Sequence, residues 1–362
     1  MVCSNVEKAL ISLVVFILFI VGSSIWFFNL LPQTPDAAQL KQSVANDIPY
    51  LQKRLPQVRG KILAVVTSTD TMGNSGKKTG YELTELSRAY WMFTVNGFEV
   101  DIASVKGGEP PVVIDNDDMK AIDYAFLNDS IAQHKVKHSK SVDEIDPDDY
   151  LAVYFVGGKG AMFDFPDNPA IQNIVKQLYQ NNKVVAAICH GPAAFANVQL
   201  DSGEYLVANK TITSFTNDEE LFLIPNADEV FPFLLEDKLI ARGAKFDGGF
   251  TYLNQTHQDN NLITGQNPWS IWSTAENIIQ ALGYTPLPRQ KSPEEFGVEL
   301  LEIYAQYGYD AAIAEIEKSP KKPFGRMIVA MHSLVAAMKF NFIEALELVR
   351  LTSALKEQAT SS

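Results

Sequence analysis

Short apolar runs alternate with longer amphipathic segments through the middle of the chain. The apolar runs have the length of strands, and we predict strands at residues 61–67, 98–103, 150–156 and 183–188. The segments between them have helical length, and we predict helices at residues 82–96, 171–180 and 191–198. Strands that alternate with helices favour a mostly parallel, doubly wound α/β sheet with helices on both faces. We assign this domain to residues 60–284.

The first apolar stretch has a different pattern. Residues 9–31 are 23 consecutive uncharged residues. As a helix they would reach about 34 Å, which exceeds the roughly 30 Å of a hydrocarbon core. We therefore expect one transmembrane helix as an anchor within residues 1–31, followed by a tether over residues 32–59. A cleaved signal peptide is the alternative, although its apolar stretch is usually only about 7–15 residues long. The short tail before the anchor favours a single-pass membrane protein whose body lies outside the cytoplasm.

After residue 284 the pattern changes to one helix after another. Ser292 and Glu295 form a capping box at the start of the first helix. Amphipathic or apolar helical segments follow at residues 309–317, 327–338 and 342–355. We predict a small all-α domain over residues 285–362 that packs on its neighbour or binds another protein.

Composition and charge exclude several classes of protein. The 362 residues carry a net charge of −13, which argues against nucleic acid as a partner. Two cysteines are too few for a disulfide scaffold or a cysteine-rich zinc domain. The remaining question is whether either thiol is reactive.

Cys189 lies where the fourth predicted strand ends and a helix begins, and His190, Gly191 and Pro192 follow it. A tight turn between a strand and a helix pushes one side chain out above the sheet. The amino terminus of a helix favours negative charge, so we expect a lowered thiol pKa at Cys189. Neighbouring backbone N–H groups could bind a developing oxyanion. The alternative is an inert buried cysteine. The adjacent His190 and the Gly-Pro turn favour a reactive thiol.

Residues 187–192, Ala-Ile-Cys-His-Gly-Pro, resemble the active-site turn of the PfpI-like superfamily within the class I glutamine amidotransferase-like fold. Other segments resemble further motifs of the superfamily in the same order, at residues 79–85, 103–110, 157–166, 215–220 and 264–268. The resemblance covers residues 61–282 and implies a flavodoxin-like fold for them. It says nothing of the predicted anchor or of the helical tail.

Within this superfamily the motifs are most similar to the branch of glutathione-independent glyoxalases and heat-shock-type chaperones. The resemblance implies that Cys189 is the nucleophile, that His190 shuttles a proton and that Glu85 lies beside the thiol. It also implies an acid that orients His190, a role whose register falls on Glu220, with Glu219 as the alternative.

The resemblance further implies positions that bind the oxyanion or the substrate. Gly158 and His190 would supply backbone N–H groups for the oxyanion, and Lys159 and Gly191 are the other candidate positions. The family usually has histidine after the glycine pair, where this chain has Lys159. A lysine there could hold an anionic product or lower the thiol pKa, but it cannot act as a neutral imidazole base.

We therefore expect a membrane-anchored, cysteine-dependent glyoxalase that converts 2-oxoaldehydes such as methylglyoxal to 2-hydroxy acids without glutathione. The chemistry requires no metal and no other cofactor. The alternatives are a thiol hydrolase (peptidase or amidase) of the same superfamily, and a non-enzymatic stress chaperone or redox sensor. The expected partners are a small aldehyde substrate, the membrane and an unknown protein bound by the helical tail, and a homodimer stays open.

Overall fold

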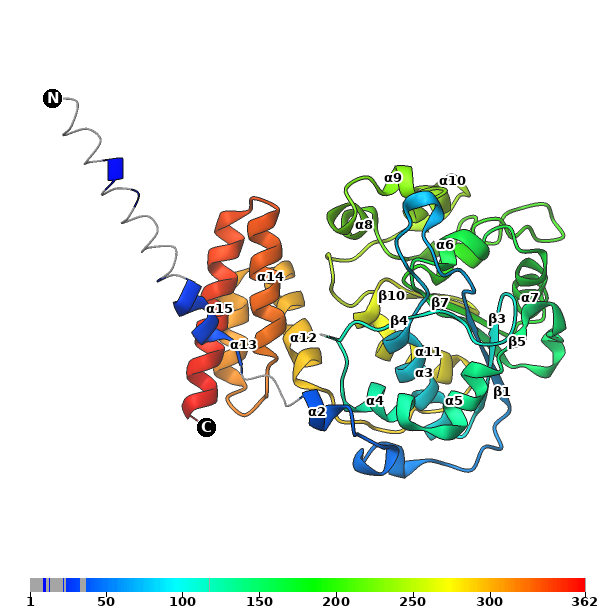
Figure 1. The fold of residues 1–362 in the computed structure, drawn as a ribbon, viewed down its shortest axis with the longest axis horizontal. Helices are drawn as coiled ribbons and strands as arrows, with labels where there is room; N and C mark the ends of the chain where they lie inside the picture. The colour runs from blue at the N-terminus through cyan, green and yellow to red at the C-terminus, as the bar shows by residue number, and fades with distance from the viewer. Residues whose placement is uncertain are drawn as a thin grey trace. The chain divides into compact units, whose positions relative to one another are not determined.

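The computed structural model describes residues 9–10, 13, 22, 24–32, 37–116 and 118–361. The chain divides into two compact units, which we describe separately. One unit comprises Asp36–Gln290, and the other comprises Met1–Pro35 with Lys291–Ser362 (Figure 1).

A seven-stranded sheet forms the centre of the first unit, with strand order β10-β11-β7-β6-β1-β3-β5. Neighbouring strands are parallel except for the antiparallel pair of β10 and β11. All four strands predicted from the sequence are present, as β1, β3, β6 and β7. The strands of the sheet are β1 (Lys61–Val66), β3 (Glu99–Ser104), β5 (Lys140–Ser141), β6 (Ala152–Phe155), β7 (Val184–Ile188), β10 (Thr256–Asp259) and β11 (Leu262–Gly265).

Helices cover both faces of this sheet, as expected for a doubly wound fold (Figure 1). Alternate residues of each central strand point to opposite faces, so that Ile62 and Ala64 join one core cluster and Leu63 and Val65 join the other. Helices α3 and α11 pack in the first cluster, and α7 packs in the second. The helices of this unit are α2 (Ala37–Leu40), α3 (Leu83–Val95), α4 (Ala121–Asn128), α5 (Ser130–Lys137), α6 (Ala161–Asp164), α7 (Pro169–Gln180), α8 (Asn217–Leu223), α9 (Ala227–Val230), α10 (Leu235–Ala241) and α11 (Ile271–Ala281).

Two short parallel strand pairs lie outside the main sheet. They are β2 (Tyr81–Glu82) with β4 (Val112–Val113), and β8 (Thr211–Ile212) with β9 (Lys245–Phe246). The second pair flanks α8, α9 and α10, which lie together with α6 at one end of the sheet in Figure 1. Since α6 follows the carboxyl end of β6, these helices cover the end at which parallel sheets usually carry their chemistry.

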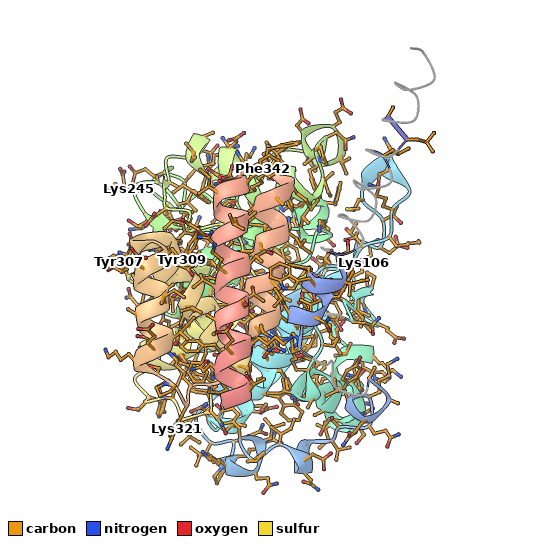
Figure 2. All side chains as sticks on the ribbon, turned by 90° about the vertical axis from the view of Figure 1, so that its left-hand side faces the viewer. Lys106, Lys245, Tyr307, Tyr309, Lys321 and Phe342 are labelled. Carbon is orange, nitrogen blue, oxygen red and sulfur yellow. The ribbon has the colours of Figure 1, made fainter. Side chains whose placement is uncertain are left out.

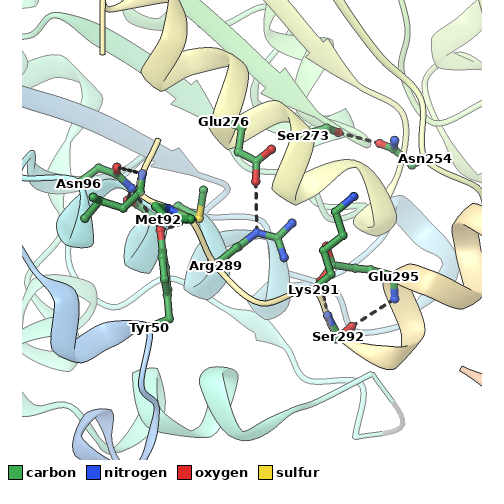
Figure 3. Close-up of polar contacts among 12 residues, drawn as sticks. Tyr50, Met92, Asn96, Asn254, Ser273, Glu276, Arg289, Lys291, Ser292 and Glu295 are labelled. Atoms are coloured by element: carbon green, nitrogen blue, oxygen red, sulfur yellow. Dashed lines mark hydrogen bonds and ion pairs between the residues drawn. The ribbon is translucent and has the colours of Figure 1, made fainter. Parts of the chain in front are cut away.

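Residues 285–290, which follow α11, form polar contacts with other residues of the α/β unit (Figure 3). The Leu287 N–H donates to Asn96 Oδ1 over 2.7 Å, and Arg289 Nε lies 3.2 Å from Glu276 Oε1. The Arg289 guanidinium also stacks 4.2 Å above the Trp272 ring. These contacts hold residues 285–290 in the α/β unit.

In the carboxyl-terminal part of the second unit, the structure describes four helices: α12 (Pro293–Tyr307), α13 (Tyr309–Lys318), α14 (Arg326–Met338) and α15 (Phe342–Ser361). The predicted capping box is present, since Ser292 Oγ accepts the Glu295 N–H and the Glu295 carboxylate accepts the Ser292 N–H. Figure 2 shows α14 and α15 side by side, with Phe342 exposed at the start of α15. A protein partner for this unit and a homodimer of the chain stay predictions.

The prediction of a membrane-spanning helix over residues 9–31 requires correction. In the part of the chain that the structure describes, no helix is long and apolar enough to cross a bilayer. The described end of this stretch belongs to the helical unit: Leu30 is only 3% exposed, and Lys356 Nζ donates to the Asn29 carbonyl over 2.8 Å. Residues 11–12, 14–21 and 23 of the stretch lie outside the described residues. The single-pass localisation and the orientation inferred from it are withdrawn with the anchor.

Candidate active site

Cys189 follows the last residue of β7 and has a left-handed backbone with φ of 58°. This conformation is rare for residues other than glycine and persists only where the surroundings enforce it. The Cys189 N–H donates to the Gly265 carbonyl and the Cys189 carbonyl accepts the Phe215 N–H, both over 2.9 Å. Chain segments on either side of the turn thus hold the thiol at the end of the sheet.

The helix predicted after Cys189 is shorter than expected. Residues Gly191–Phe195 form a 3-10 helix, η6, of five residues. A short helix has few aligned peptide dipoles, so it gives the thiol little of the stabilisation expected from a helix amino terminus.

A hydrogen-bonded chain links the thiol to a carboxylate through the neighbouring histidine. Cys189 Sγ lies 3.3 Å from His190 Nδ1, and His190 Nε2 lies 2.5 Å from Glu220 Oε2. Burial acts to raise the pKa of Glu220, but the charge of His190 and its hydrogen bond outweigh burial and hold that pKa below its ordinary value. An ionised Glu220 accepts the Nε2–H, which leaves the Nδ1 lone pair directed at the thiol. The arrangement can accept the thiol proton at Nδ1.

Glu85 lies on the other side of the thiol, in the first turn of α3. The residue is fully buried, and its Oε2 accepts the Gly157 N–H over 2.7 Å. Burial raises the pKa of Glu85 well above its ordinary value, and the nearby charge of Glu82 adds to the effect. Burial therefore favours the neutral carboxyl group, which can share a hydrogen bond with the Cys189 thiol.

Gly157 allows Glu85 and Cys189 to approach each other. A Cβ atom at this position would lie 2.5 Å from Glu85 Oε2 and 2.7 Å from Cys189 Cβ. Both distances are shorter than van der Waals contact, so a larger residue would push the acid and the thiol apart.

The thiol pKa differs from the sequence-based expectation. Burial raises the pKa of Cys189 well above its ordinary value, and the Glu85 carboxyl adds to the rise, while the positive charge of Lys159 opposes it. A lowered pKa was expected because a longer helix was expected. The contacts of Cys189 with His190, and of His190 with Glu220, offer a route by which this thiol could lose its proton.

Two backbone N–H groups are candidates for an oxyanion site. The N–H groups of Gly158 and His190 donate no backbone hydrogen bond within the described residues. Gly158 has φ of +102°, and the backbone of residues 80–82 leaves no room for a side chain there. Gly191, the first residue of η6, is similarly closed in by the Phe155 carbonyl. The N–H groups of Gly158 and His190 thus remain candidates for an oxyanion site, whereas Gly191 provides close backbone packing.

Lys159 follows Gly158 and is partly buried. Its positive charge acts on both the Cys189 thiol and the Glu220 carboxylate. Lys159 follows the carboxyl end of β6 and Cys189 follows that of its parallel neighbour β7, so both residues lie at the same end of the sheet.

A comparison with known protein families decides the assignment. Residues 77–281 match the DJ-1/PfpI family. The chain belongs to this family. The match includes Cys189, His190, Glu85 and Glu220, and it excludes the helical unit.

Members of the DJ-1/PfpI family with named activities resemble this chain. Glyoxalase 3 of Candida albicans is 31% identical over 235 residues, which cover 61% of this chain and 97% of the relative. The glutathione-independent glyoxalase HSP31 of Saccharomyces cerevisiae is 32% identical over 231 residues, with coverage of 61% and 97%.

Solved structures of related proteins agree with the fold. Rapid Encystment Protein 24 KDa of Francisella tularensis is 37% identical with a TM-score of 0.59, and the match covers 62% of this chain and 99% of that chain. Glyoxalase III of Candida albicans is 29% identical with a TM-score of 0.57, and the match covers 62% and 97%.

Glu219, the alternative partner for His190, has other contacts. Its carboxylate accepts hydrogen bonds from a surrounding group of donors, namely Thr216 N, Thr216 Oγ1, Tyr252 N, Gln266 Nε2 and Asn267 Nδ2. Thr216 and Glu219 form a capping box at the start of α8. The spacing of threonine and glutamate was visible in the sequence and could have assigned this structural role to Glu219.

The sequence analysis also missed the aromatic residues around His190. The Phe215 ring centroid lies 4.7 Å from that of His190, and the Phe231 centroid lies 6.1 Å away. Phe231 follows α9, far along the chain from the cysteine motif, and no local pattern indicated its position. These rings limit the access of water to the imidazole.

Metal ligands do not gather at this site. Among the described residues, no group of three or more histidine, cysteine, aspartate and glutamate side chains is placed to hold a metal ion. The expectation that the chemistry uses no metal or other cofactor stays a prediction.

Proposed function

We propose that this protein is a glutathione-independent glyoxalase that uses Cys189 to convert 2-oxoaldehydes to 2-hydroxy acids. The hydrogen-bonded chain from Cys189 through His190 to Glu220 carries the proposal, because it combines a nucleophile with a proton acceptor. Relatives that align over nearly their whole length are named glutathione-independent glyoxalases, which supports the same reaction class.

In the first step the Cys189 thiol transfers its proton to His190 Nδ1, and the sulfur adds to the aldehyde carbon, C1. The carbonyl oxygen then takes the proton from His190, which gives a hemithioacetal and leaves His190 neutral. The backbone N–H groups of Gly158 and His190 bind this oxygen while it is negatively charged. When its carboxyl group is neutral, Glu85 donates a hydrogen bond to the thiolate, whereas an ionised Glu85 would raise the pKa of Cys189.

In the second step neutral His190 removes the proton from C1, and an enediolate forms across C1 and C2. His190 then returns a proton to C2, which leaves a thioester at C1. General acid–base catalysis of this kind contributes typically about 10²–10⁴-fold. Water hydrolyses the thioester, which releases the 2-hydroxy acid and restores the thiol. The net reaction of methylglyoxal and water gives lactate and one proton.

The direct test is lactate formation from methylglyoxal by the full chain in the absence of glutathione. We expect turnover by the wild type and none by Cys189→Ala. Asp218→Asn is the matched control, because Asp218 is exposed on α8 beside the site. Equal rates for the wild type and Cys189→Ala would refute the proposal.

The two alternatives give different results with the same variants. A thiol hydrolase would cleave peptide or amide substrates and lose this activity in Cys189→Ala. A chaperone would suppress client aggregation equally well as Cys189→Ala. A redox sensor would form a reversible sulfenic acid at Cys189.

A further inference from the structure

Lys159 is held in place by its two neighbours along the chain. The backbone of residues 80–82 lies directly against Gly158. On the other side, a Cβ atom at Gly160 would lie 2.7 Å from Thr67 Cγ2 and 2.8 Å from the Thr69 carbonyl oxygen. Because both glycines are enclosed, the backbone of Lys159 has a fixed position at the carboxyl end of β6.

Within the described part of the chain, the charge of Lys159 has no direct partner. Its ammonium group forms no ion pair or side-chain hydrogen bond with a described residue, although its charge acts on Cys189 and Glu220. The Glu220 carboxylate instead accepts its short hydrogen bond from His190. A partly buried cation without a partner is suited to an anionic ligand, because desolvated ionic hydrogen bonds are stronger than neutral ones.

We propose that Lys159 binds a carboxylate on the aldehyde that reacts with Cys189, so that the site prefers anionic aldehydes to neutral ones. This inference rests on the proposed function, since it assigns the substrate class of the same thiol. The aldehyde carbon bonds to the Cys189 sulfur, the thiol proton passes to the new hydroxyl group, and the carboxylate keeps its charge and pairs with the ammonium group of Lys159.

A purely electrostatic effect of Lys159 on the thiol would give a different result. If the cation only favoured the thiolate, its removal would weaken the addition of neutral and anionic aldehydes equally. Preference for a carboxylate requires contact between that group and the lysine. The two roles are therefore separated by two aldehydes that differ only in charge.

Glyoxylate and its neutral amide, glyoxylamide, form such a pair. Both offer an aldehyde to the thiol, and neither has the ketone that the isomerisation requires, so both form dead-end hemithioacetals. Binding is measured on the full chain as protection of Cys189 from alkylation by iodoacetamide, with mass spectrometry to confirm the modified residue. This readout requires no turnover, so it is independent of the glyoxalase assay.

The variants are Lys159→Gln, Lys159→Arg and the control Lys245→Gln. Lys245 is an exposed lysine on β9 (Figure 2), and its substitution changes the net charge by the same amount. For the wild type, Lys159→Arg and Lys245→Gln, we expect glyoxylate to protect at a concentration at least about ten-fold lower than glyoxylamide does. In Lys159→Gln we expect this preference to disappear, because the loss of protection by glyoxylate exceeds any loss of protection by glyoxylamide.

The inference is overturned if Lys159→Gln still prefers glyoxylate, or if this variant loses protection by both aldehydes equally. It is also overturned if the wild type shows no preference for glyoxylate or no protection of Cys189. Lactate formation from methylglyoxal judges the proposed function separately. Turnover of methylglyoxal without a preference for glyoxylate would refute the role of Lys159 alone. A preference for glyoxylate without turnover of methylglyoxal would refute the proposed glyoxalase activity and leave the role of Lys159 intact.

Discussion

Replacement of Glu220 by glutamine tests how the buried thiol becomes ionised. The variant Glu220→Gln keeps the size of the side chain and removes its negative charge, 2.5 Å from His190 Nε2. Glutamine can also donate its N–H to Nε2, which would move the ring proton to Nδ1 and block proton transfer from Cys189. The change therefore affects both the histidine cation and its tautomer.

The size of the effect follows from the distance and the burial of the pair. Two unit charges about 4 Å apart attract each other by about 4 kcal/mol at an effective dielectric constant near 20. That energy corresponds to about three pKa units, and it is an upper limit because the amide keeps a hydrogen bond. We expect the apparent pKa of the Cys189 thiol to rise by about one to two units, which lowers the alkylation rate near neutral pH about 10- to 100-fold.

The assay is the pH dependence of the rate at which iodoacetamide alkylates Cys189. Asp218→Asn is the matched control, since it removes the same charge from an exposed position on α8. Methylglyoxal turnover, measured in parallel, is expected to fall mainly in kcat, with little change in KM. If the alkylation profile of Glu220→Gln coincides with that of the wild type, the histidine does not ionise the thiol in the way derived above.

Three further predictions concern the stability and the geometry of the same region. Glu85 has a raised pKa in the folded state, so its contribution to stability is complete below the unfolded pKa, near 4.5, and is lost as the pH rises toward the folded pKa. The free energy of unfolding of Glu85→Gln should therefore increase relative to that of the wild type as the pH is raised from 5 to 8. Urea unfolding of both proteins at the two pH values tests this, and an equal difference between them at pH 5 and pH 8 would contradict it. Gly157→Ala should cost about 1–3 kcal/mol by overpacking and abolish most of the reactivity of Cys189, as measured by unfolding and by alkylation. Asp123→Asn removes the charge that pairs with the buried Arg88 at 3.0 Å, and a loss of about 3–5 kcal/mol is expected in denaturant unfolding, where a loss below 1 kcal/mol would contradict it.

The alternation of strands and helices was predictable because it depends on local patterns. The runs of apolar residues that became β1, β6 and β7 are buried on both faces of the sheet, which is why they are nearly continuous in the sequence, whereas β3 alternates because Glu99 and Asp101 are only partly buried. The short pairs β2 with β4 and β8 with β9 were not predicted. They have two residues in each strand, too few for any periodicity to be recognised.

The choice between Glu219 and Glu220 shows a limit of the sequence. The two residues are adjacent on α8, and neighbouring residues on a helix point about 100° apart, so only one of them can face His190. Packing of α8 directs Glu220 to the histidine and Glu219 to Tyr252, Gln266 and Asn267. The resemblance suggested this assignment, but the contacts themselves depend on residues distant in the chain.

The apolar stretch at the amino terminus shows the same limit. Hydropathy records how apolar residues 9–31 are, and it does not distinguish lipid from the apolar interior of a protein as their surroundings. In the described part of the stretch, Leu30 is buried within the helical unit, whereas Leu10, Leu13, Ile25, Trp26 and Phe28 are exposed.

The sequence by itself determined the parallel α/β architecture, the helical tail and the position of Cys189 at the end of a strand, because periodicity and turn residues act over short distances. Only the tertiary structure decided the direction of the thiol pKa and the partners of each carboxylate. Burial, and the close approach of Glu85, His190 and Lys159 to the sulfur, arise from contacts between segments far apart in the chain. A local pattern does not contain those contacts.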